Sequence, residues 1–103
     1  MDATKWQIPH GEGYREIQNE DSLQYINADL SRTLYMSLIT YKNNPRGTTP
    51  DAPAPVGPVI EFDVDKYHLK GTKTKPGEVL VIVITFARKD DETFGRQLFA
   101  DIH

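Results

Sequence analysis

The run from Val79 to Phe86 constrains the fold more than any other stretch of the chain. It reads VLVIVITF, and its side chains are apolar at odd and even positions alike, apart from Thr85. Successive side chains of a strand point to opposite faces of its sheet, so this strand has two apolar faces. It is far too short to cross a bilayer. We therefore expect it at the centre of a sheet that is covered on both sides.

Two further signals place strands beside this run. Lys75-Pro76-Gly77-Glu78 precedes it, and proline followed by glycine is typical of a type II turn. Residues 60–69 form a second extended region, in which the apolar side chains stand at even-numbered positions first and at odd-numbered positions later. A bulge or turn near Asp65-Lys66 is needed to keep those side chains on the core.

The stretch from Leu23 to Tyr41 carries two competing patterns. Its leucines and isoleucine recur at spacings of three and four, which is typical of a helix. Residues 32–41 alternate instead, with Tyr35 and Tyr41 on the same face, and they are rich in strand-forming residues. The alternation favours a hairpin with its turn at residues 28–31, and the helix stays an alternative.

The C-terminal end predicts a helix over residues 93–102. Phe94, Leu98, Phe99 and Ile102 fall on one helical face, and acidic residues precede them where the helix dipole favours negative charge. The chain is thus expected to be one α+β domain, residues 1–103: an antiparallel sheet with the C-terminal helix packed on one face. The other face must be closed by the N-terminal arm, by aromatic side chains or by another subunit.

A long proline-rich loop is predicted in mid-chain, over residues 43–59. Those 17 residues hold five of the seven prolines and read NNPRGTTPDAPAPVGPV. Proline removes backbone donors and restricts φ, so regular structure is not expected there. Loops of this length inside a compact domain are usually functional or disordered. We expect an exposed connection between strands that is able to serve recognition.

Composition excludes several classes of function. The net charge is −3 and the chain has no cysteine, which argues against nucleic acid as the main partner and excludes thiolate metal sites, disulfides and a cysteine nucleophile. The first residues hold no apolar run with a basic flank, so no signal peptide is predicted and the cytoplasm is the expected compartment. No membrane association is expected.

No motif for catalysis, cofactor binding or metal binding stands out. The three histidines are far apart in sequence, and the serines lack a nucleophile context. A small-ligand or enzyme site near Asp63, Asp65, Tyr67 and His68 is the alternative, with the two aspartates expected on one strand face. Alternation alone also explains that pair as a solvated face. The protein is thus expected to have no enzymatic activity, cofactor or metal.

Four lysines, Lys66, Lys70, Lys73 and Lys75, recur over ten residues. They could form a small anion-binding patch, or they could guard an edge strand against pairing with another sheet. The edge-strand interpretation is the simpler one.

Aromatic and proline residues supply the candidate contacts for a protein partner. Tyrosine and tryptophan are frequent anchors of protein interfaces, and proline-rich segments dock into aromatic grooves. The predicted partner-binding residues are Trp6, Tyr35, Tyr41, Arg46, Pro50, Pro53 and Pro55.

The order of these parts resembles the Mog1/PsbP-like superfamily, which includes DcrB-type proteins of bacteria. The features that carry the resemblance are Ile8-Pro9 and Gly13-Tyr14 before two strands, Ser37 within LYMSL, the long apolar strand and the terminal helix. The proline-rich segment stands where that superfamily has a helix. The resemblance implies a sheet-plus-helix fold and a non-catalytic binding role.

These observations predict a small non-enzymatic protein-binding module, which would act as an adaptor, an effector chaperone or an immunity or inhibitor protein. Its expected contact surfaces are a tyrosine-rich sheet face and the proline-rich loop. Two alternatives remain: a small-ligand binder or enzyme, and a structural subunit of a larger assembly, including a homo-oligomer.

Overall fold

A computed structural model describes residues 1, 4–9, 13–40 and 55–103 of the chain. Six antiparallel strands form one sheet in the order β1-β2-β3-β6-β5-β4, and a single α-helix of the described residues follows them. The strands are β1 (Arg15–Gln18), β2 (Ser22–Ile26), β3 (Arg32–Thr40), β4 (Val59–Asp63), β5 (Lys66–Lys75) and β6 (Glu78–Phe86). The 3-10 turn η1 (Lys89–Asp91) leads into α1 (Glu92–Asp101). The fold is α+β, as predicted.

The sheet consists of two three-stranded meanders joined at its centre. β1, β2 and β3 form one meander, and β4, β5 and β6 form the other. β3 pairs with β6 over nine residues, from Arg32 opposite Phe86 to Thr40 opposite Glu78. The predicted hairpin over residues 22–41 is confirmed for its described part, and the helical alternative is wrong. The prediction that residues 79–86 form a central strand is confirmed.

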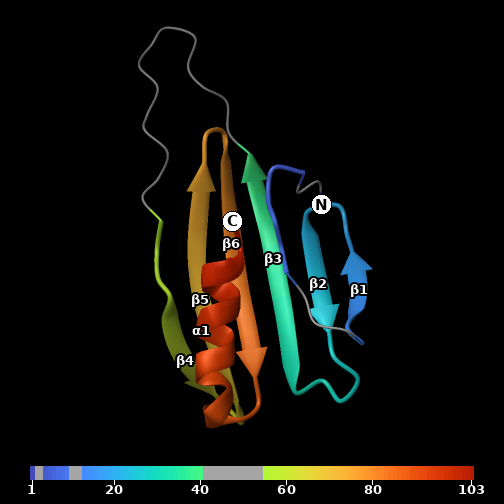
Figure 1. Ribbon diagram of the computed structural model, residues 1–103, viewed down its shortest axis with the longest axis vertical. Coiled ribbons are helices and arrows are strands. Elements are labelled where there is room, and N and C mark those ends of the chain that lie inside the picture. The colour runs from blue at the N-terminus through green and yellow to red at the C-terminus, as the bar shows by residue number, and fades with distance from the viewer. Residues whose placement is uncertain (2–3, 10–12, 41–54) are drawn as a thin grey trace, which may run out of the picture.

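One face of the sheet holds the hydrophobic core, and we call it the covered face. The even-numbered side chains of β6 point into it, and Leu80, Ile82, Ile84 and Phe86 are fully buried. β3 adds Leu34 and Met36 to this core, because they stand opposite Ile84 and Ile82 in the ladder. Helix α1 lies across this face over β5 and β6 (Figure 1).

The helix lies close to the sheet because glycines stand at two contact points. A Cβ added to Gly71 on β5 would come within 2.6 Å of the Phe99 ring, and one added to Gly95 on α1 would come within 3.1 Å of the Phe86 ring. Phe99 therefore fills the space above Gly71. The predicted helix over residues 93–102 is confirmed, with its ends shifted by one residue.

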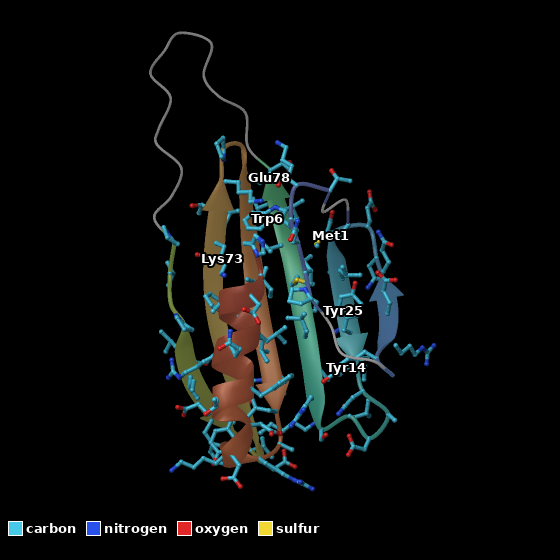
Figure 2. All side chains as sticks on the ribbon, in the orientation of Figure 1. Met1, Trp6, Tyr14, Tyr25, Lys73 and Glu78 are labelled. Carbon is cyan, nitrogen blue, oxygen red and sulfur yellow. The ribbon has the colours of Figure 1, made fainter. Side chains whose placement is uncertain are left out.

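The N-terminal arm covers the same face as the helix. Figure 1 shows it running along β3 toward the C-terminal end of the chain, and the backbones of Gln7 and His103 exchange two hydrogen bonds there. Trp6 is buried in the core, and its indole N–H donates to a carboxylate oxygen of Glu78 at 2.7 Å (Figure 2). The arm thus extends the cover of the core face, and it does not close the other face.

Two turns join the strands of the second meander. Gly77 has a φ of 84°, as the predicted type II turn at residues 75–78 requires. The turn between β4 and β5 is a two-residue turn, Val64-Asp65, flanked by the Asp63–Lys66 pair. Val64 has a φ of 58°, a strained value for a β-branched residue. The bulge or turn predicted near Asp65-Lys66 is therefore a turn that reverses the direction of the chain.

Candidate functional site

The second face of the sheet is the candidate functional site, and we call it the open face. The odd-numbered residues of β6 point to it. Their partners across the ladder point there too: Tyr35, Ser37 and Ile39 of β3, and His68, Lys70, Thr72 and Thr74 of β5. Val79, Val81 and Val83 form its central row, and all three remain half-buried. Neither α1 nor the N-terminal arm reaches them, because both lie on the covered face (Figure 1).

Of the two faces of the central strand that were expected to be covered, the described residues cover one. One helix and one short arm supply the cover, and both bind to the face with the larger side chains. The central strands β3 and β6 place no charged side chain on the open face between Thr33 and Ile39, or between Val79 and Thr85. Its surface is instead built from valine, isoleucine, threonine, serine and one tyrosine.

Charged groups stand toward the edges of the open face. Lys70 of β5 pairs with Glu61 of β4, with 2.8 Å between Nζ and the carboxylate oxygen. Hydrogen bonding to Lys70 and its positive charge lower the pKa of the Glu61 carboxyl, although both groups are exposed. The ring of His68 is 2.9 Å from the hydroxyl of Thr85. The open face therefore has an uncharged centre and a polar margin, which is the pattern of protein interfaces.

The predicted partner-binding residues lie in different parts of the molecule. Tyr35 is on the open face, half-buried, opposite Val83. Trp6 is in the core beneath the arm, so it stabilises the fold and presents no surface. Pro55 is exposed. Tyr41, Arg46, Pro50 and Pro53 lie outside the described residues.

The prediction of a tyrosine-rich sheet face needs correction for the described residues. Tyr14, Tyr25 and Tyr67 pack against the core on the covered face, and Tyr35 is the one aromatic side chain of the described strands on the open face. The open face is thus mainly a β-branched aliphatic surface. Sequence reasoning missed its valine row, although the signal was the double-sided apolar strand itself.

The C-terminal end of the predicted proline-rich loop belongs to the fold. Val56 accepts a backbone hydrogen bond from Thr72 at 2.7 Å and donates one to the Thr72 hydroxyl at 2.8 Å. Gly57 lies directly over β5, where a Cβ would come within 2.6 Å of the Lys70 carbonyl oxygen. β4 begins at Val59. Residues 43–54 of the loop lie outside the described residues.

The alternative ligand site near Asp63, Asp65, Tyr67 and His68 converges only in part, because Asp63 and His68 line one open hollow that the other two residues do not join. Asp63 ends β4 and Asp65 lies in the turn, so they do not alternate along one strand as predicted. Tyr67 stacks on Phe86 on the covered face, with ring centroids 5.5 Å apart, whereas the neighbouring His68 points to the opposite face. No enclosed polar site is formed by these four residues.

The interpretation of the four lysines as an edge guard is wrong for Lys66 and Lys70, because they lie where β5 is paired with β4. The pairing with β4 ends at Lys70, so Lys73 and Lys75 lie beyond it, and their side chains bind other parts of the chain. Lys70 pairs with Glu61. Lys73 donates to the carbonyls of Ala100 and Ile102 at the end of α1, and its Nζ lies 4.9 Å from the Phe99 ring centroid. Lys75 donates to the carbonyl of Lys5 and lies over the Trp6 ring. Lysines 73 and 75 thus fix the helix end and the arm to the sheet.

Comparisons with known proteins add no assignment. No family model, curated protein or solved structure matches the chain. The resemblance to the Mog1/PsbP-like superfamily stays a prediction. Among the described residues, no group of three metal-ligating side chains converges, and no helix has the length and apolar character that a membrane span requires.

Proposed function

We propose that the protein is a non-enzymatic binding module whose open face binds another protein. The observation that carries this proposal is the row Val79, Val81 and Val83, which continues the most apolar strand of the chain on the side that no described element covers. The sequence suggested three ways to close this face: the N-terminal arm, aromatic side chains, or another protein chain. The arm lies on the other face, and Tyr35 is the one described aromatic side chain of the strands on this face. Another protein chain is the option that remains.

The size of the open face supports an interface. The six strands differ in length from 4 to 10 residues, and with strands about 4.8 Å apart and roughly 3.3 Å per residue the face has an area on the order of 700 Å². Standard protein interfaces bury roughly 800 Å² on each partner. The open face together with its margin is thus of the right order, and its uncharged centre avoids the desolvation cost of buried ions.

The proposal keeps the finer roles predicted from the sequence. An adaptor, an effector chaperone and an immunity or inhibitor protein all act through such a surface, and the proline-rich segment with Arg46, Pro50, Pro53 and Pro55 is proposed to add contacts. The proposed compartment is the cytoplasm. A second copy of the chain is an alternative partner for the same face.

The test compares two charge substitutions at equally exposed apolar residues. Ile39 lies on the open face and is 52% exposed, and Leu30 lies in the β2–β3 turn and is 56% exposed. We expect Ile39→Lys to lose the protein captured from a native cell extract and Leu30→Lys to retain it, with both variants folded. Light scattering on the purified protein distinguishes a second copy from another partner. Equal capture by both variants would refute the proposal.

A further inference from the structure

A separate groove lies on the covered face, where the helix leaves part of the sheet free. Its volume is about 340 Å³, and it runs between α1 and the half of the sheet formed by β2 and β3. The lining residues that define it are Tyr14, Tyr25, Arg32, Leu34, Phe94 and Leu98. Figure 2 shows Tyr14 and Tyr25 over the half of the sheet formed by β2 and β3, to one side of α1, so the groove separates them from the helix.

The groove has an apolar floor and an aromatic wall. Leu34 and Tyr25 form the buried floor, with 3% and 8% of their surface exposed. Phe94 and Leu98 are one helical turn apart on α1, and both are half-buried because their side chains face the groove. Leu98 was predicted as part of the helix face that packs on the sheet. It also forms the edge of this cavity.

The charged group at the groove is already neutralised by the protein. The Arg32 guanidinium donates to Asp91 through two nitrogens, at 2.7 and 3.2 Å, and its central carbon lies over the Phe94 ring, 4.2 Å from the ring centroid. The hydrogen bond and charge of Asp91 raise the pKa of Arg32 despite its partial burial, and Tyr14 contributes a further hydrogen bond. Arg32 therefore already has a counterion, and its guanidinium group is held in place by Asp91 and Phe94.

Two further polar groups of the groove are also paired. The Tyr25 hydroxyl donates to Glu16 at 3.2 Å, and the Gln97 amide donates to Asp101 at 2.9 Å. An anion that entered the groove would lose its hydration without gaining an unpaired cation. A cation would meet only the Asp101 carboxylate, which is exposed to solvent and already accepts from Gln97. A neutral molecule would meet mainly aromatic rings, aliphatic side chains and a guanidinium stacked over an aromatic ring, with the hydroxyls of Thr33 and Thr93 beside them.

We propose that this groove is a binding site for a small, uncharged, flat aromatic molecule. Its volume lies at the lower end of the roughly 300–1,000 Å³ that small-molecule pockets span, so the ligand has one or two fused rings. The site uses the opposite face of the sheet from the protein-binding surface and does not depend on it.

The test uses 2-naphthol and its charged analogue 2-naphthoate as probes, titrated at neutral pH into the isotope-labelled full chain. Binding is followed by the shifts of backbone amide signals. We expect 2-naphthol to shift the signals of residues at the groove, and 2-naphthoate to bind at least about tenfold more weakly because its charge stays uncompensated. No shift with millimolar 2-naphthol, or equal binding of both probes, would overturn the proposal.

Matched tryptophan variants locate the site. Leu98→Trp fills the groove and should abolish 2-naphthol binding, whereas Arg96→Trp adds the same ring to an exposed position of the same helix and should leave binding unchanged. If Leu98→Trp does not fold, Phe94→Ala replaces it and should weaken binding severalfold by removing the aromatic wall. Binding that survives in the groove variant, or that Val81→Thr on the open face abolishes, would refute the assignment.

Discussion

The two faces of strand β6 show how one apolar run can serve two purposes. Leu80, Ile82, Ile84 and Phe86 are fully buried under α1 and the N-terminal arm. Val79, Val81 and Val83, which alternate with them, stay half-exposed on the open face. The two sets of side chains are chemically similar, and they differ in whether another element packs on them. The described residues contain one helix, and it packs on the covered face.

This difference separates stability from binding. Side chains on the covered face make their contacts within the chain, so a change there is expected to cost folding free energy. Side chains on the open face make part of their contacts with neighbouring strands and have the rest available for a partner. Changes on the open face should therefore affect binding more than folding.

The largest expected effect is a truncation on the covered face. Ile82→Ala should lower the free energy of unfolding by roughly 2–5 kcal/mol, because it leaves a cavity between Met36 and the helix. Val81→Ala, one residue away on the open face, should cost only about 1 kcal/mol, since its side chain is half-exposed. Urea unfolding followed through the fluorescence of the single tryptophan measures both. Equal losses would show that the open face is as tightly packed as the core.

A smaller effect is expected where the helix touches the sheet. Gly71→Ala places a methyl group against Phe99 and the Val56 carbonyl, and overpacking of this kind typically costs about 1–3 kcal/mol. Thr74→Ala on the other face of the same strand is the control and should cost less than about 1 kcal/mol. Thermal unfolding of the two variants compares them. A Gly71 variant as stable as the unmodified protein would contradict the described helix position.

The smallest expected effect is a pH dependence from Tyr25. Burial first, and then the Glu16 carboxylate, raises the pKa of its hydroxyl above the ordinary value of 10.0. The folded state thus prefers the neutral phenol, so this contribution to stability is complete below pH 10 and is lost as the pH rises toward the folded-state pKa. In Tyr25→Phe the fall in stability above pH 10 should be shallower, as measured by urea unfolding at several pH values. An equal fall in stability with pH in Tyr25→Phe and in the unmodified protein would contradict this contribution of Tyr25.

The sequence predicted those parts of the fold that rest on local chemistry. The turn at residues 75–78 follows from Pro76 and Gly77, and the β2–β3 hairpin from the alternation of β3. The Val64-Asp65 turn was not predicted as a hairpin, because valine at a positive φ contradicts the usual turn residues. Strain at that position is compensated by the pairing of β4 with β5, a tertiary effect.

The arrangement of the two faces could not be predicted from local patterns. Trp6 lies on the covered face because it hydrogen-bonds to Glu78, a residue 72 positions away. No local sequence pattern encodes such a contact, so the sequence alone could not predict which face of the sheet the arm covers. The same holds for the groove, whose walls come from β2, β3 and α1. The sequence predicted a binding surface with tyrosines, and the structure places most of the described tyrosines on the other side.

Site-specific photo-crosslinking tests the central claim, that the open face binds a protein, most directly. A benzophenone side chain replaces Tyr35 on the open face in one variant and Arg96 on the exposed side of α1 in the other, and each is irradiated in native cell extract. We predict a discrete crosslinked protein from position 35 and none from position 96, with both variants folded. A crosslinked product from position 96 alone, or from neither position, would contradict the assignment of binding to the open face.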